Sequence, residues 1–140
     1  MPFDFAKINW LGVLVVAVIN FFVGALWYTV MFGKLWIQLN GYSEQQVKEM
    51  QAKMSPVRFF GGMVLSQLIL ALATAVVLTG FADLNLQTAL VVGVAFWLVS
   101  AAISMTNHLA SDKPDALYLI DVSCHLVYLI VAGVLLGLWR

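Results

Sequence analysis

The 140-residue chain is poor in charge and in cysteine. Charged residues make up only 10% of it, with seven acidic and seven basic side chains, whereas a soluble domain carries roughly a quarter. Because the charges balance and form no basic patch, we expect no nucleic-acid partner. The one cysteine, Cys124, excludes an intramolecular disulfide framework and a metal site built from cysteines alone.

Motifs of the common enzyme and cofactor classes are also missing. The chain has no phosphate-binding loop, dinucleotide fingerprint, hydrolase nucleophile elbow or metalloprotease motif. We therefore expect no cofactor, and an enzyme is the least favoured class. Cys124 would need an activating group to act as a nucleophile, and the neighbouring His125 would point about 100° away on a helix. A small buried hydrophobic residue is the simpler interpretation of Cys124.

Long apolar runs fill most of the remaining sequence, and hydrophobic residues make up 63% of the chain. The runs 8–32, 56–78, 86–105 and 116–139 each approach or exceed the roughly 20 residues needed to cross about 30 Å of hydrocarbon. Backbone groups in lipid must be satisfied within their own segment, so each run predicts a membrane-spanning helix. The expected fold is an all-α integral membrane protein, a single four-helix bundle over residues 1–140 that is surrounded by the lipid bilayer.

One sizeable hydrophilic stretch, 33–55, interrupts these runs. Residues 43–46 match a capping box, and Val47, Met50 and Met54 follow at helical spacing. This pattern predicts a short amphipathic cytoplasmic helix between the first two membrane helices, lying on the membrane surface or against the bundle. A solvated linker helix is the alternative.

Lysine and arginine in short loops indicate which side of a membrane a loop occupies. The side that contains the stretch 33–55 carries five of these residues, and the side with both termini carries Lys7 and Arg140. We therefore expect the long first loop in the cytoplasm and both termini outside, in the cytoplasmic (inner) membrane of a bacterium. The five residues are Lys34, Lys48, Lys53, Arg58 and Lys113.

Polar side chains form a stripe along the last apolar run. Tyr118, Asp121, His125 and Tyr128 recur at i, i+3, i+7 and i+10, which places them on one side of a helix. An ionisable pair inside a membrane helix is costly, so Asp121 and His125 are candidates for a functional site. The stripe must face protein or water, because lipid would leave its polar groups unpaired.

The other three runs offer polar side chains that can meet this stripe. With a rise of about 1.5 Å per residue, the deepest of them lie near the middle of the bilayer and the rest lie toward the cytoplasmic side. We therefore expect a polar pocket within the membrane that opens toward the cytoplasm. These further candidates are Asn20 and Tyr28 in the first run, Gln67 in the second, and Ser104 and His108 in the third.

Several interpretations of this cluster remain open. Histidine changes charge near neutral pH, and a carboxylate one turn away stabilises that charge, so the pocket can bind or transport protons or a small molecule. Alternatively the polar groups only hydrogen-bond helices together, in a structural or accessory subunit without ligand chemistry. A metal held by His125, Asp121 and His108, with Cys124 as a fourth ligand, is a weaker alternative, since no recognised ligand spacing appears.

Pairs of small residues four positions apart occur in three of the runs. Such pairs allow helices to approach closely, and they fit either a compact bundle or a homo-oligomer, of which a dimer is favoured. The pairs are Ala71 and Ala75, Ala89 and Gly93, and Gly133 and Gly137.

Blocks of sequence at both ends of the chain carry a resemblance to a known family. The first block comprises 9–11 (Asn-Trp-Leu), 24–28 (Gly-Ala-Leu-Trp-Tyr) and 32–36 (Phe-Gly-Lys-Leu-Trp). The second comprises 125–127 (His-Leu-Val) and the glycines and Trp139 near the end. Together they resemble a family of small bacterial membrane proteins catalogued as domain of unknown function 1761 (DUF1761). The resemblance implies a small multi-helix membrane protein and supplies no activity.

The chain departs from this family's pattern at two places. The pattern has Ser-Pro after the Trp-Tyr pair, where this chain has Thr29 and Val30, and Asn-Ala-Gly-Tyr-His where this chain has residues 121–125. The match at His125 and the mismatch at Asp121 imply a hydrogen-bonding role for position 121 rather than a general proton relay. The resemblance therefore adds Trp27 to the candidates and favours Trp27, Tyr28 and His125 as the shared site.

Overall fold

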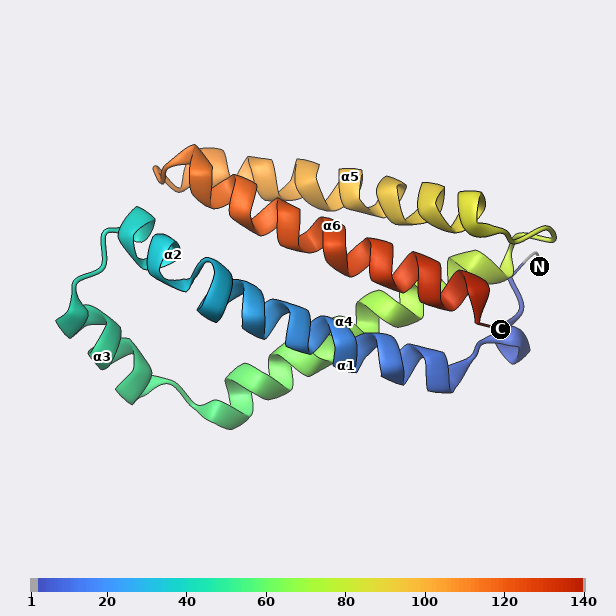
Figure 1. Ribbon diagram of the computed structural model, residues 1–140, viewed down its shortest axis with the longest axis horizontal. Helices are drawn as coiled ribbons and strands as arrows, with labels where there is room; N and C mark the ends of the chain where they lie inside the picture. Colours follow the sequence, from blue (N-terminus) through green and yellow to red (C-terminus); the bar gives the residue numbers. More distant parts are fainter. Residues whose placement is uncertain (1–2, 140) are drawn as a thin grey trace.

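A computed structural model describes residues 3–139, which form an elongated bundle of helices (Figure 1). No strand occurs among these residues. Arg140, which entered the prediction of orientation, lies outside the described residues. The elements are a 3-10 turn (Phe5–Lys7), α1 (Trp10–Leu26), a π-helical segment (Trp27–Met31), α2 (Gly33–Asn40), α3 (Glu44–Lys53), α4 (Pro56–Thr79), α5 (Leu86–Ala110) and α6 (Asp115–Leu138).

Four of these elements are long and apolar enough to cross a membrane, as the sequence predicted. The first span combines α1 with the π-helical segment over 22 residues, and α4, α5 and α6 contain 24, 25 and 24 residues. At about 1.5 Å per residue, each of these lengths covers the hydrocarbon core of a bilayer. The chain is therefore a multi-pass, all-helical membrane protein.

Side-chain caps begin several helices where the sequence indicated a start. Ser55 accepts a hydrogen bond from a backbone N–H at the start of α4, and Pro56 occupies the first helical position. Asn85 caps α5 in the same way, and Ser43 and Gln46 form both hydrogen bonds of a capping box on α3. These caps satisfy N–H groups that have no partner within the helix. The position of α3 relative to the membrane surface stays a prediction.

Two helical features were not apparent from the sequence. The π-helical segment continues α1 with a wider turn, in which the Phe32 N–H donates to the Trp27 carbonyl at 2.9 Å. A separate helix, α2, then follows and ends at Gly41, whose positive φ of 72° suits glycine at a helix C-terminus. In addition, α5 continues to Ala110, five residues beyond the apolar run.

Small residues bring α5 and α6 into close contact. A Cβ atom added to Gly133 would lie 2.6 Å from the Ala89 carbonyl oxygen, and one added to Gly93 would lie 2.7 Å from the Leu129 carbonyl oxygen. The backbones therefore approach too closely for any residue larger than glycine at these positions. Because the small-residue pairs of α5 and α6 pack against each other within one chain, the predicted homo-oligomer would have to use another surface.

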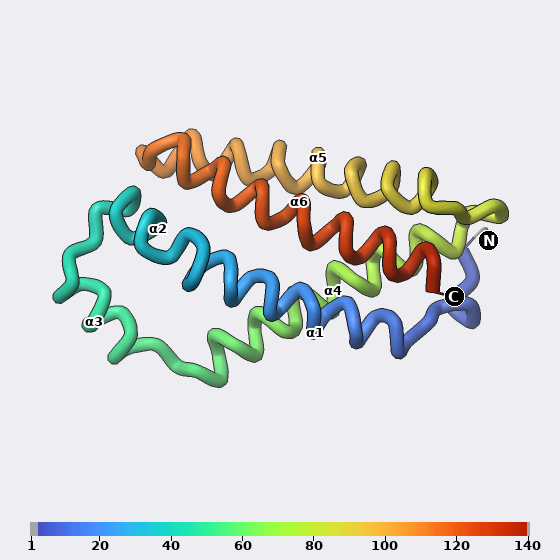
Figure 2. The backbone as a smooth tube through the Cα atoms, viewed as in Figure 1, coloured from blue at the N-terminus to red at the C-terminus, as the bar shows by residue number. Residues whose placement is uncertain are grey.

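Helix α6 is the most buried of the four spans. It packs against α5, α1 and α4, and Figure 2 shows it running between α5 and α1 along the length of the bundle. Because α6 contacts all three other spans, its polar stripe faces protein rather than lipid.

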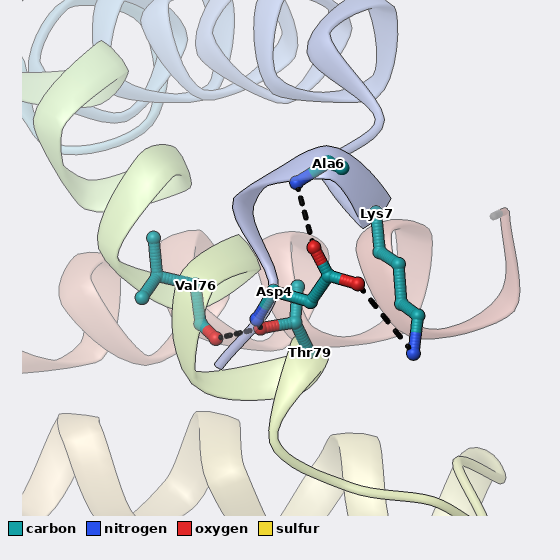
Figure 3. Close-up of polar contacts among 5 residues, drawn as sticks. All are labelled: Asp4, Ala6, Lys7, Val76 and Thr79. Atoms are coloured by element: carbon teal, nitrogen blue, oxygen red, sulfur yellow. Dashed lines mark hydrogen bonds and ion pairs between the residues drawn. The ribbon is translucent and has the colours of Figure 1, made fainter. Parts of the chain in front are cut away.

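Several contacts hold the helices together at the end of the bundle where both termini lie (Figure 1). The Asp4 N–H donates to Thr79 Oγ1 at 3.1 Å, while Asp4 also caps the first turn and lies 3.8 Å from Lys7 Nζ (Figure 3). The Asn9 side chain donates to the Trp139 carbonyl at 3.0 Å. The apolar core fills this half of the bundle and includes Val13, Val16, Ala71, Ala75, Ala132 and Leu136.

Candidate functional site

The π-helical segment positions two aromatic side chains against α6. The Tyr28 hydroxyl donates to Asp121 Oδ1 at 2.6 Å, and Trp27 Nε1 donates to the Ile120 carbonyl at 3.0 Å. A hydroxyl–carboxylate distance this short is typical of a charge-assisted hydrogen bond. Turns of π-helix within α-helices are frequently found at functional sites, because the extra residue redirects side chains. Here the segment places Tyr28 and Trp27 next to consecutive residues of α6.

His125 lies one turn further along α6, where it contacts α5 and a neighbouring residue of α6. Its Nδ1 is 3.2 Å from the Ser100 hydroxyl of α5, and its ring stacks on Tyr128 with 6.2 Å between centroids. Tyr128 is buried, and its hydroxyl lies directly against Gly24, so that a Cβ atom there would collide with it. Gly24 thus allows α1 to pack against the stripe of α6.

Asn20 and Gln67 lie deeper than this group, and each keeps an unpaired oxygen. Asn20 is fully buried and donates through Nδ2 to the Tyr128 carbonyl at 3.1 Å, but no group between residues 3 and 139 donates to its Oδ1. Gln67 Oε1 is also buried without a partner among the described residues. A buried acceptor without a donor costs free energy, so both oxygens call for a hydrogen-bond donor.

A cleft of about 1260 Å³ opens between the helices at the end of the bundle opposite the termini. Gly24, Asp121 and His125 form its inner end, called the cleft floor below, and Tyr28 lines the wall beside them. One side of the cleft is apolar and comes from α1, α3 and α4, with Phe21, Met50, Met54, Phe59, Phe60 and Met63. The opposite side is polar and comes from α5 and α6, with Ser104, Asn107, His108, Tyr118, Asp121 and His125.

Two of the candidates from the sequence lie nearer the mouth of the cleft, where α5 meets α6. His108 Nε2 is 2.9 Å from Asp115 Oδ1, and the Tyr118 hydroxyl donates to the Ala101 carbonyl at 2.9 Å. Because His108 is paired at the mouth, it does not join Asp121 and His125 at the floor. Between residues 3 and 139, no three histidine, cysteine or acidic side chains form a group that can hold a metal ion.

The structure therefore brings most of the predicted residues to one cleft and separates the others from it. Ser104, His108 and Tyr118 line the cleft together with the floor and Tyr28. Trp27, Asn20, Gln67 and Tyr128 do not line it. They lie behind the lining, in the packing between helices.

The apolar side of the cleft could not be identified from the sequence. Phe60 and Met63 of α4 lie within an apolar run that carries no sign of a site, although Met63 faces Gly24 in the structure. The helical spacing of Met50 and Met54 is visible in the sequence, but only the fold shows that both line the cleft, Met50 from α3 and Met54 directly after it. Nothing in a single sequence distinguishes an apolar side chain that faces a cleft from one that faces lipid.

One comparison with known proteins gives a match. The sequence profile of the family described as "Protein of unknown function (DUF1761)" matches residues 11–137. No curated protein and no solved structure matches the chain significantly.

Proposed function

Because the chain belongs to the DUF1761 family, whose description assigns no activity, we propose a function from the geometry of the cleft. The protein is a small component of the bacterial inner membrane that binds a small molecule in the cleft, and moves that molecule or protons across part of the membrane. His125, Asp121 and Tyr28 contact the ligand, and Ser104 and Tyr118 line its path of entry.

The observation that carries this proposal is that three polar side chains, Tyr28, Asp121 and His125, lie together at the cleft floor and on the wall beside it. Tyr28 and Asp121 are hydrogen-bonded at 2.6 Å, and Asp121 shares the cleft floor with His125. Polar side chains that only hold helices together are normally enclosed by their partners. These three line a space of about 1260 Å³, which exceeds the roughly 300–1,000 Å³ of typical small-molecule sites.

The packed half of the bundle limits what this conformation can do. Beyond the floor, Val13, Val16 and Leu136 belong to the apolar core of the bundle. We therefore expect a ligand to enter from the mouth of the cleft. Movement across the membrane requires a second conformation in which this core opens and the cleft closes.

The distribution of basic residues supports cytoplasmic entry. Lys34 and Lys113 line the cleft, and the other basic residues of that side lie on α3 and at the start of α4. Loops rich in lysine and arginine face the cytoplasm. In this orientation the cleft opens to the cytoplasm and both termini lie outside.

Native mass spectrometry of the detergent-released protein tests the proposal. We expect a small molecule to remain bound to the wild-type protein and to be lost from His125→Ala, which keeps its fold. His108→Ala is the matched control. It removes the second histidine of the chain, which lies at the mouth of the cleft and away from the floor, and the variant should retain the molecule. A folded wild-type protein that carries nothing, or that copurifies with a larger partner in its place, would instead support an accessory subunit.

A further inference from the structure

The hydrogen-bonding capacity that remains free at the floor is mainly that of an acceptor. Asp121 Oδ1 accepts from Tyr28, but no side chain or backbone group among residues 3–139 donates to Asp121 Oδ2. His125 uses Nδ1 with Ser100 and has no protein partner at Nε2 within the same range, so Nε2 donates or accepts according to the tautomer of the ring. A carboxylate oxygen can only accept, so a ligand that reaches the floor is best matched if it donates hydrogen bonds.

The two unpaired amide oxygens lie one helical turn below the floor. A Cβ atom at Gly24 would lie 3.7 Å from Met63 Cε, so these two residues face each other between α1 and α4. Asn20 lies one turn earlier on α1, and Gln67 lies one turn later on α4. Because α1 and α4 run in opposite directions (Figure 1), Asn20 and Gln67 both lie about one turn further from the mouth than Gly24 and Met63, and both unpaired oxygens are acceptors. The two amide dipoles thus lie behind the lining, about one turn from the carboxylate at the floor.

The charge at the floor is negative, so it favours a ligand that carries a positive charge and donates hydrogen bonds. Among the described residues, Asp121 is the single acidic side chain that lines the cleft, and it is half-buried, whereas Lys34 and Lys113 are exposed. Lys113 Nζ is 3.3 Å from the Asn40 carbonyl and lies 5.4 Å from the centre of the Tyr42 ring. Water and salt screen exposed charges more strongly than half-buried ones, so Asp121 dominates the electrostatic field at the floor.

The apolar side of the cleft suits a ligand with a hydrophobic or aromatic body. Its rings and thioethers surround the approach to Asp121, and ammonium groups are attracted to the faces of such rings. Methionine side chains adapt to ligands of irregular shape. The rings that line the cleft include Phe21, Tyr28, Phe59, Phe60 and Tyr118.

Resting on the proposed function, we propose that the ligand is a protonated amine attached to an apolar body. An ammonium group supplies three hydrogen-bond donors and no acceptor, which complements the free carboxylate oxygen of Asp121. Its charge pairs with Asp121, and its apolar body lies against the phenylalanines and methionines of α1, α3 and α4. A carboxylate ligand of the same shape is disfavoured by Asp121.

Calorimetric titration of the purified full-length protein in an uncharged detergent tests this inference. The probes are 4-phenylbutylamine and 5-phenylpentanoate, which share one body and differ in the sign of their charge. We expect the amine to bind the wild-type protein and the carboxylate not to bind. Asp121→Asn keeps an acceptor for Tyr28 but removes the charge, so the amine should lose about tenfold in affinity or more.

Asp112→Asn is the matched control for the loss of one negative charge at the same end of the bundle. Asp112 does not line the cleft, and its φ of 52° is readily adopted by asparagine, so affinity for the amine should be unchanged. Binding of the carboxylate in preference to the amine would overturn the inference and leave the proposed function standing. Equal binding of the amine to wild type and to Asp121→Asn would also overturn it. If neither probe binds, both the inference and the small-molecule site are contradicted.

Discussion

The substitution Gly133→Ala tests the close contact between α5 and α6. The new Cβ atom would lie 2.6 Å from the Ala89 carbonyl oxygen, a backbone atom that cannot move independently of its helix. The two helices would have to separate, and overpacking of this kind costs about 1–3 kcal/mol. Alanine in a helix interior gains about 0.5–1 kcal/mol over glycine, so we expect a net destabilisation of about 0–2.5 kcal/mol.

Gly61→Ala is the matched control for helix propensity. Gly61 lies within α4, and a Cβ atom added there has no neighbouring atom within 4 Å. Only the propensity gain remains, so Gly61→Ala should stabilise the protein by about 0.5–1 kcal/mol. The free energies of unfolding can be measured by titration with a denaturing detergent, with tryptophan fluorescence and circular dichroism as probes. Equal stability changes of the same sign in the two variants would refute the close approach of α5 and α6.

Three further substitutions test individual contacts. Asn9→Ala removes the cap of α1 and the hydrogen bond to Trp139, and it should lower the free energy of unfolding by about 1 kcal/mol in the same titration. Gln67→Leu replaces a buried oxygen that lacks a protein partner, so the ligand-free protein should be unchanged or stabilised by up to about 1 kcal/mol, and a large loss would show that the oxygen is paired. Tyr28→Phe removes the 2.6 Å hydrogen bond to Asp121, and it should reduce ligand retention in native mass spectrometry while the helix content by circular dichroism is unchanged.

The local features of the fold could be predicted from the sequence because they depend on neighbouring residues. The lengths of the apolar runs determine the four spans, and Ser55, Asn85 and the capping box at Ser43 determine where helices begin. The π-helical segment at Trp27–Met31 could not be predicted in this way. Its wider turn is associated with the contacts of Trp27 and Tyr28 on α6, which are distant in the sequence.

The site could be predicted in part, since polar side chains in a membrane helix avoid lipid. This rule predicted that Asp121 and His125 face the interior of the bundle, and in the structure both line the cleft together with Ser104 and Tyr28. It could not determine which polar groups meet, because that depends on the order of helices. His108, for example, pairs with Asp115 at the mouth of the cleft.

No such rule identifies the apolar side of the cleft. Phenylalanine and methionine are equally suited to lipid and to a ligand cleft, so Phe60 and Met63 became recognisable only after α4 was placed against α1. The same ambiguity applied to the small-residue pairs. Gly133 and Gly137 fit a dimer as well as a bundle, and the fold shows that they pack against α5.

The central claim is that a cleft lined by polar groups of α5 and α6 opens to the side of α2 and α3. Cysteine accessibility in intact membranes measures this most directly, and the natural Cys124 is buried and should give little background. Ser104→Cys lines the cleft, whereas Val99→Cys lies on the exposed outer side of α5, which would face lipid. A water-soluble maleimide applied from the side of α2 and α3 should label Ser104→Cys and leave Val99→Cys unlabelled. Absence of labelling at both positions, in correctly folded variants, would contradict the account.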